Sequence, residues 1–139
     1  MSNPSIGVSV TAGIEGLACR LTHGPSGTVI QTVPPKDNGG TGLCFSPTDL
    51  VGAALASCVL TTMALQAGRE GLDWGDAHAV VEKRMTPPPR RIAELALVIQ
   101  MPREVRHDQR ERLEEIAHSC PVARSLHPEM RLPIEFRYP

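Results

Sequence analysis

Residues 46–68 form an apolar stretch that limits what this chain can fold into more than any other part of the sequence. Positions 50–65 carry no charged side chain, and this composition predicts a helix that is apolar on nearly every face. Such a helix must be covered on all sides, either by protein or by lipid. Because a membrane-spanning helix needs roughly 20 apolar residues, which this uncharged run does not reach, we expect a central helix buried in protein and no membrane partner.

Both ends of this helix carry residues that suit helix termini. Ser46 is a favourable N-cap, and Pro47 falls at the first helical position, where its missing N–H does no harm. Asp49 stands three residues after Ser46, which completes a capping box and places negative charge at the positive end of the helix dipole. Gly68 is the expected C-terminal stop.

The chain is 139 residues long, which predicts a single domain spanning residues 1–139. A domain of this size buries only about two-thirds of its unfolded surface. It therefore has difficulty covering an apolar helix on every side by itself. We expect a second copy of the chain to cover part of the helix, in a homodimer.

Charge and composition exclude several kinds of partner. The formal net charge is −1 and aromatic residues make up 3% of the chain, which provides neither a basic surface nor a stacking platform for nucleic acid. The first residues lack the basic start and apolar run of a secretory signal, so we expect a cytoplasmic protein. In that reducing compartment the cysteines are expected to be free or catalytic rather than paired in structural disulfides.

Hydrophobic periodicity predicts strands and further helices around the apolar helix. The expected strands are residues 6–10, 17–22, 28–33, 77–86, 90–101 and 132–138. The first three are expected to form an antiparallel meander, and strands 77–86 and 90–101 are expected to pair as a hairpin. One face of strand 90–101 carries Ala93, Leu95, Leu97, Ile99 and Met101. A second helix is expected at 108–118 with Asp108 as its N-cap, and a short helix at 120–126 with Pro121 at its first position. The order βββ-α-ββ-α-β predicts an α+β fold with antiparallel sheets around a long central helix.

Cys58 and Cys120 are the candidates for thiol chemistry. Each is either a small core residue, as free cysteines often are, or a reactive thiol. Cys120 stands at the start of the predicted short helix, where free amides and the helix dipole favour a thiolate. Cys58 lies about three turns into its helix, too far along for the dipole to help. If Cys58 reacts, something else must lower its pKa, most simply an Arg supplied from another element.

Arg20 is the local candidate for that cation. It shares one face of the predicted strand 17–22 with the small residues Ala18 and Thr22. The alternative is that Arg20 is exposed or pairs with a structural acid, and the pattern alone does not choose between the two.

The remaining cysteines and histidines indicate no further site. Cys19 is expected to pack on the apolar face of its strand, and nothing near Cys44 indicates activation. The histidines show neither H-x-x-x-H nor H-E-x-x-H spacing, so no metal and no cofactor are expected.

The two main cysteine segments resemble those of a known family. Phe45–Leu50 followed by Ala54–Cys58 resembles the first-cysteine helix of the OsmC/Ohr family, and Cys120–Leu126 resembles its second-cysteine motif. His23–Gly27 and Asp37–Gly40 are similar to the OsmC-like branch of these thiol-dependent hydroperoxide reductases. The resemblance spans nearly the whole chain, in order.

This resemblance implies both a fold and an activity. The fold is an intertwined α+β homodimer with active sites at the subunit interface, and the activity is cofactor-free reduction of organic hydroperoxides. Cys58 would become a sulfenic acid that Cys120 resolves to a disulfide, with Arg20 supporting the thiolate. A dithiol reductant of the lipoyl or thioredoxin type would then restore both thiols.

One departure from the family lies in the first turn of the helix. In the peroxidase branches a Glu there pairs with the arginine, and here Thr48 occupies its position. Asp49 is the nearest acid, and it is either a helix cap or an active-site acid turned by about 100° around the helix. The alternative function is a non-catalytic or weakly catalytic stress-associated dimer that binds an apolar small molecule at the subunit interface.

Overall fold

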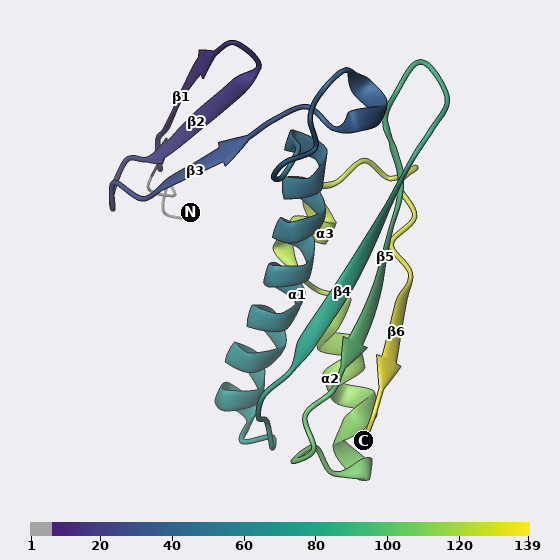
Figure 1. The fold of residues 1–139 in the computed structure, drawn as a ribbon. Coiled ribbons are helices and arrows are strands. Elements are labelled where there is room, and N and C mark those ends of the chain that lie inside the picture. The colour runs from purple at the N-terminus through teal and green to yellow at the C-terminus, as the bar shows by residue number, and fades with distance from the viewer. Residues whose placement is uncertain (1–6) are drawn as a thin grey trace, which may run out of the picture. The chain divides into compact units, whose positions relative to one another are not determined.

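The structure is a computed structural model of the chain, and it describes residues 7–139. The chain forms two compact units, Met1–Leu50 and Val51–Pro139. Each unit is described by itself below, with the elements labelled as in Figure 1.

The first unit contains a three-stranded antiparallel sheet in the order β1-β2-β3. Its strands are β1 (Val10–Glu15), β2 (Ala18–His23) and β3 (Val29–Thr32), and they form the expected meander (Figure 1). The position of the first strand was wrong, because it begins at Val10, where the predicted strand ends. Ile6 lies outside the described residues. Gly13 continues the strand, and the reversal falls at Gly16, whose φ of 61° suits glycine.

A short 3-10 helix, η1 (Lys36–Asn38), connects this sheet to the central helix. It ends at Gly39, which adopts a left-handed conformation with φ 81°. The Val33 N–H then donates to the Phe45 carbonyl at 3.0 Å. This bond ties the end of the loop to the end of β3, directly before the helix begins.

Helix α1 spans Pro47–Glu70 and opens with the predicted capping box. The Asp49 N–H donates to Ser46 Oγ at 3.0 Å, and the Ser46 N–H donates to Asp49 Oδ2 at 2.9 Å. The predicted stop at Gly68 was wrong. The helix continues through it, at a cost of about 1 kcal/mol for a helical glycine, and the left-handed residue is Gly71, with φ 68°.

The second unit contains a mixed sheet in the order β4-β5-β6. Strands β4 (His78–Met85) and β5 (Ile92–Gln100) form the expected antiparallel hairpin, whereas β6 (Ile134–Arg137) runs parallel to β5. The prediction that this sheet is antiparallel throughout was therefore wrong. The reason is that the chain passes through two helices before returning beside β5, and such crossovers permit parallel pairing.

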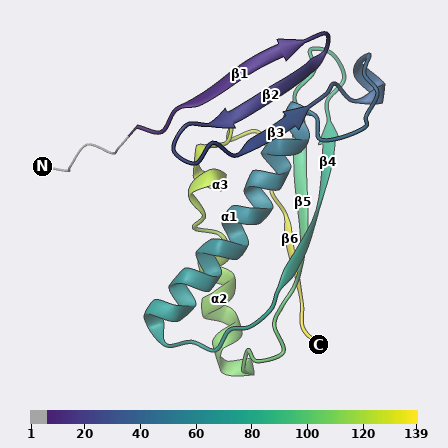
Figure 2. The same ribbon diagram turned by 60° about the vertical axis from the view of Figure 1, so that its left-hand side comes forward.

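These two helices are α2 (Arg110–Ala117), preceded by the 3-10 helix η2 (His107–Gln109), and α3 (Pro121–Ser125). Asp108 lies inside η2, so its predicted role as N-cap was wrong. The N-cap residue of α2 is Gln109. Its side chain does not cap α2 and instead accepts a hydrogen bond from the Asp73 N–H at 3.0 Å. In both views α1, α2 and α3 lie on one side of the second sheet (Figures 1 and 2).

The core of the second unit lies between these helices and β5. Leu95, Leu97 and Ile99 alternate into it, at 0–2% exposure, as the periodicity predicts. Near the start of the strand the buried residue is Ile92 rather than the expected Ala93, because the pairing register with β4 shifts between Arg84 and Met85.

Helix α1 is buried along one stripe and exposed along another. The buried stripe consists of Gly52, Leu55, Val59, Met63 and Ala67. On other faces Leu65 is 55% exposed, and Ala54, Ser57 and Thr61 are exposed as well. By length and composition α1 would also serve as a membrane span, a criterion that core helices of soluble proteins meet too. Within the second unit, part of this apolar helix is therefore left uncovered.

Candidate active site

The second unit brings Cys58 and Cys120 together, although they are far apart in the sequence. Cys58 is half-buried on α1, and Cys120 is fully buried at the residue before α3. The two thiols interact directly, and both are free. The backbone of Cys120 is extended, with φ −60° and ψ 132°, and Pro121 begins α3 as predicted. This geometry aims the first amides of α3 at the sulfur pair.

The pKa of the Cys58 thiol lies below its ordinary value. Burial raises this pKa, but hydrogen bonds from the Cys120 thiol, the Val122 amide and the Thr62 hydroxyl together outweigh that effect. Each of these groups stabilises the negative sulfur. Cys58 thus has the electrostatic environment of a nucleophilic thiolate.

The pKa of the Cys120 thiol lies above its ordinary value. Burial is the largest cause and the neighbouring Cys58 adds to it, while the amides of Ala123 and Val122 act in the opposite direction. The position of Cys120 at a helix start had favoured a thiolate there, whereas the family resemblance implied that Cys58 is the attacking thiolate. In the structure the pKa of Cys120 is raised, since its burial outweighs the amides, and the Val122 amide also serves Cys58.

Thr62 is a site residue that sequence reasoning missed. Its Oγ1 lies 3.8 Å from Cys58 Sγ, within hydrogen-bonding distance for sulfur. The i, i+4 spacing on one helix face was the available signal. A threonine among many uncharged residues of α1 gave no reason to single it out.

Arg20 lies in the first unit, on the face of β2 that the sequence predicted. It lines a concavity of about 650 Å³ together with Ala18, Thr22 and Gln31. Gln31 is its cross-strand neighbour on β3. Arg20 is exposed, which leaves the side chain accessible to an anionic group.

Asp49 also belongs to the first unit, and its role as a helix cap is confirmed by the reciprocal bonds with Ser46. Thr48 Oγ1 lies 3.2 Å from Ser46 Oγ, so its hydroxyl also contacts the cap. The first turn of α1 is thus held together by its own side chains.

An apolar cavity of about 230 Å³ adjoins the segments that carry both cysteines. Leu55 and Val59, on either side of Cys58 in the sequence, line it from α1, and Ala123 lines it from α3. Its remaining walls come from β5, α2, α3, β6 and the residues next to them: Leu97, Ala117, His118, Arg124, Leu132 and Ile134. A space of this kind suits an apolar group better than a charged one.

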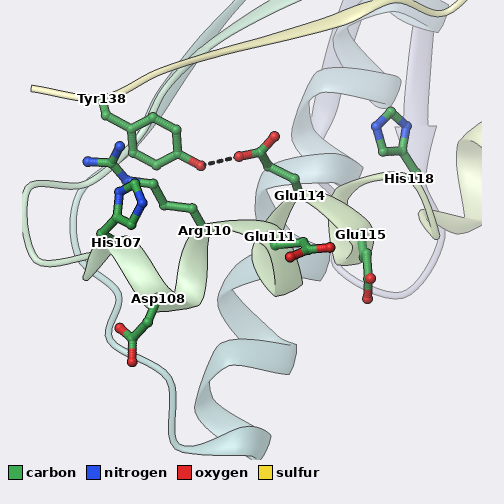
Figure 3. A pocket seen from close by; sticks show the side chains of 8 residues that line it. All are labelled: His107, Asp108, Arg110, Glu111, Glu114, Glu115, His118 and Tyr138. Atoms are coloured by element: carbon green, nitrogen blue, oxygen red, sulfur yellow. Dashed lines mark hydrogen bonds between the residues drawn. The ribbon is translucent and has the colours of Figure 1, made fainter.

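A second, polar pocket of about 720 Å³ lies along α2 and is shown in Figure 3. There the Tyr138 hydroxyl donates to Glu114 Oε2 at 2.6 Å, and the Arg110 guanidinium stacks over the tyrosine ring at 3.9 Å. Burial, followed by the hydrogen bond to Glu114, raises the pKa of Tyr138. The acidic and histidine side chains around it do not converge, and no metal-ligating cluster occurs among residues 7–139.

The other two cysteines lie in the first unit. Cys19 is half-buried in β2, and Cys44 is exposed, with its thiol 3.6 Å from the Gln31 carbonyl oxygen. Neither contributes to the Cys58–Cys120 pair, whose two sulfurs are supplied by the second unit.

Comparison with solved structures places this arrangement among known folds. A protein from Psychrobacter arcticus, named an osmotic stress induced and detoxification response protein, is 31% identical, with 99% of this chain and 100% of that chain covered and a TM-score of 0.87. An organic hydroperoxide resistance protein from Legionella pneumophila is 18% identical, with 96% and 98% covered and a TM-score of 0.77. One from Elizabethkingia anophelis is 16% identical, with 99% and 100% covered and a TM-score of 0.80.

No match was found among curated proteins. The family model described as "OsmC-like protein" matches residues 40–135, which include α1, both cysteines of the pair, β4, β5 and the start of β6. The predicted α+β fold with a long central helix is confirmed by the solved structures, and the chain forms two three-stranded sheets. The chain therefore belongs to the OsmC-like protein family.

Proposed function

We propose that this protein reduces organic hydroperoxides with its own two thiols, Cys58 and Cys120. The observation that carries the proposal is the direct interaction of these thiols, in which the pKa of Cys58 is lowered and that of Cys120 is raised. Relatives of the same fold are named organic hydroperoxide resistance proteins, which supports this substrate class.

In the first step the Cys58 thiolate attacks the terminal oxygen of the hydroperoxide. A sulfur–oxygen bond forms and the oxygen–oxygen bond breaks, so the sulfur loses two electrons and becomes a sulfenic acid. The departing alkoxide takes up a proton and leaves as an alcohol. A lowered thiol pKa makes the attacking form available near neutral pH.

In the second step the Cys120 sulfur attacks the sulfenic sulfur of Cys58. A disulfide bond forms, the sulfur–oxygen bond breaks and water leaves. A dithiol of the lipoyl or thioredoxin type then exchanges with this disulfide, becomes oxidised itself and restores both protein thiols. The raised pKa of Cys120 suits this order, because Cys120 stays protonated while Cys58 meets the oxidant.

Arg20 is the proposed cation beside the Cys58 thiolate in the assembled protein. Its exposure on the polar face of β2 supports this role. Asp49 is the acid closest to the family position in the sequence, but the capping box engages its carboxylate. We propose that Asp49 contributes by fixing the first turn of α1 rather than by holding Arg20.

The proposed active form is a homodimer. We propose that it is located in the cytoplasm, where a dithiol of the lipoyl or thioredoxin type reduces its disulfide. Apolar side chains remain exposed on both units, which supports a second copy as their cover. They include Ile14, Leu17, Leu65 and Val80, which are between 55% and 68% exposed. Light scattering on the purified protein should return twice the chain mass of 15.0 kDa, and a stable monomer would remove the dimer from the proposal.

The central experiment is reduction of an organic hydroperoxide such as cumene hydroperoxide, with a dithiol as donor. Wild type is expected to turn over, whereas Cys58→Ser and Cys120→Ser are expected to lose turnover. Cys44→Ser is the matched control, because its thiol is exposed and lies outside the pair. Mass spectrometry after one equivalent of peroxide should show a disulfide that joins the Cys58 and Cys120 peptides. Equal rates in wild type and the two site variants would overturn the proposal.

A second candidate function is binding of an apolar small molecule without turnover. The apolar cavity beside the cysteine segments and the presence of Thr48 in place of an acid favour it. Binding of a medium-chain alcohol, measured by isothermal titration calorimetry, would favour this function over catalysis if the Cys58 pKa also lies near the unperturbed value of about 8.5.

A further inference from the structure

The side chain of Thr62 is placed to act on the sulfur that we propose to react. Thr62 follows Cys58 by four residues on α1, and both side chains are half-buried. Cys58 Sγ and Thr62 Oγ1 lie 3.8 Å apart. Residues at this spacing are neighbours on one face of a helix, so the contact follows from the helix itself and does not depend on distant elements.

The hydroxyl of Thr62 has another possible partner in a helix, and the structure shows which one it takes. Serine and threonine side chains often bond back to the carbonyl four residues earlier. The hydrogen-bond partner of Thr62 Oγ1 in the structure is instead the sulfur of Cys58. A threonine also has restricted χ1 freedom in a helix, so this orientation is held at a small entropic cost.

We propose that Thr62 donates a hydrogen bond to the Cys58 thiolate and thereby sets the reactivity of this thiol. This inference rests on the proposed hydroperoxide reduction and names a further residue for it. A hydroxyl can donate to a thiolate, whereas a thiolate can only accept. Ionisation of Cys58 therefore fixes the direction of a bond that either group can donate while the thiol is neutral.

Two other groups also form hydrogen bonds with the Cys58 sulfur. They are the Cys120 thiol and the Val122 amide. Of the three groups, Cys120 is the titratable one, and it contributes little as a donor once it is deprotonated. The hydroxyl of Thr62 does not titrate in the working range and lies on the same helix as the nucleophile. It therefore supports the thiolate over the whole pH range in which Cys58 reacts.

The neighbouring Thr61 provides a matched control. It has the same side chain on the same helix, but it is exposed and lies about 100° away around the helix axis. Thr62→Val removes the hydroxyl while keeping the size and branching of the side chain. Thr62→Ser keeps the hydroxyl and should restore the effect. Thr61→Val makes the same chemical change away from the sulfur.

The test follows the rate at which iodoacetamide labels Cys58 as a function of pH, read by mass spectrometry of the Cys58 peptide in the full-length protein. Thr62→Val is expected to move the midpoint of this profile upward and to slow labelling at pH 7 by about three- to tenfold, since one pKa unit is a tenfold change in thiolate. Thr62→Ser and Thr61→Val should label like wild type. The peroxidase rate at saturating dithiol should be lower in Thr62→Val than in wild type, and it should be unchanged in Thr62→Ser and Thr61→Val.

Three outcomes separate this inference from the proposed function. An unchanged labelling profile in Thr62→Val overturns the role of Thr62, even if wild type reduces hydroperoxide. A profile that shifts equally in Thr61→Val also overturns it, because the effect would then be general to the helix. Absence of hydroperoxide reduction in wild type overturns the proposed function, and the labelling profile still decides whether Thr62 acts on Cys58. If Thr62→Val does not fold, Thr62→Ala removes the same hydroxyl with a strong helix former.

Discussion

Cys58 and Cys120 lie against each other in the second unit, and the pKa of Cys58 is lowered while that of Cys120 is raised. The half-buried Cys58 gains donors that stabilise its thiolate, whereas the fully buried Cys120 stays protonated. Two chemically identical side chains thus acquire different roles from their surroundings.

Replacement of Cys120 should separate the oxidation step from its resolution. We expect Cys120→Ser to consume about one equivalent of hydroperoxide per chain and then stop, because Cys58 is oxidised without a partner thiol. Dimedone, which traps sulfenic acids, should label Cys58 in this variant and leave Cys58→Ser unlabelled at that position. Continued turnover of Cys120→Ser would assign resolution to another thiol.

The opposite pKa displacements predict an order of alkylation. At pH 7 a larger fraction of Cys58 than of Cys120 is thiolate, so Cys58 should be labelled first, and its labelling should slow as the pH falls through its lowered pKa. Cys58→Ala removes one cause of the raised Cys120 pKa, so the Cys120 profile should move to lower pH. Isotope-coded alkylation with peptide mass spectrometry measures both, and a profile of Cys120 that stays in place would contradict the coupling.

Leu95→Ala tests the core that supports α1. Leu95 is 0% exposed, on the face of β5 that packs into the core, and we expect a loss of about 2–5 kcal/mol in the free energy of unfolding. Urea denaturation followed by circular dichroism measures this loss. Leu43→Ala makes the same substitution at a residue that is 85% exposed and should change the free energy by less than about 0.5 kcal/mol. Similar losses in both variants would contradict the assigned core.

Ser46→Ala tests whether the first turn of α1 depends on its capping box. Loss of the hydroxyl removes the acceptor for the Asp49 N–H, and we expect a loss of about 0.5–2 kcal/mol in unfolding free energy. Hydroperoxide reduction at a temperature where the variant is folded should change little. A large fall in activity at unchanged stability would place this turn in the catalytic machinery and return Asp49 to the role of an active-site acid.

The ion pair between Glu70 at the end of α1 and Arg112 on α2 predicts a local pH dependence. Hydrogen bonds from Arg112 and then Gln66 lower the pKa of Glu70 from 4.5 to about 2. A carboxylate with a lowered folded pKa stabilises the fold above its unfolded pKa, and this contribution is lost as the pH falls from about 4.5 towards 2.

Nuclear magnetic resonance titration of Glu70 should show this lowered pKa, and Arg112→Gln should return it towards the ordinary value. Because the pair is exposed to solvent, its effect on stability should be small and weakened by salt. A titration unchanged in Arg112→Gln would assign the shift to another group.

Much of the local structure follows from the sequence. The capping box at Ser46 and Asp49, the start of α3 at Pro121 and the alternating face of β5 were all predicted, because each depends on residues close together in the chain. The errors also have local causes. Gly68 was taken as a stop, yet the extra turn carries Glu70 to its ion pair with Arg112. The left-handed stop falls instead at Gly71, and one glycine inside a helix costs only about 1 kcal/mol, so Gly68 alone is a weak signal of a helix end.

The sequence by itself determined which segments are helices, which are strands, and that Cys58 and Cys120 are the thiols to examine. Tertiary structure decided that these two sulfurs meet, which of them is the better thiolate, and that β6 runs parallel to β5. The physical reason is that periodicity and capping act over a few residues, whereas burial and contact depend on elements far apart in the chain. The pKa of Cys120 is set by a balance between burial and hydrogen bonding, and this balance depends on the packing of α1, α2 and α3 on the same sheet.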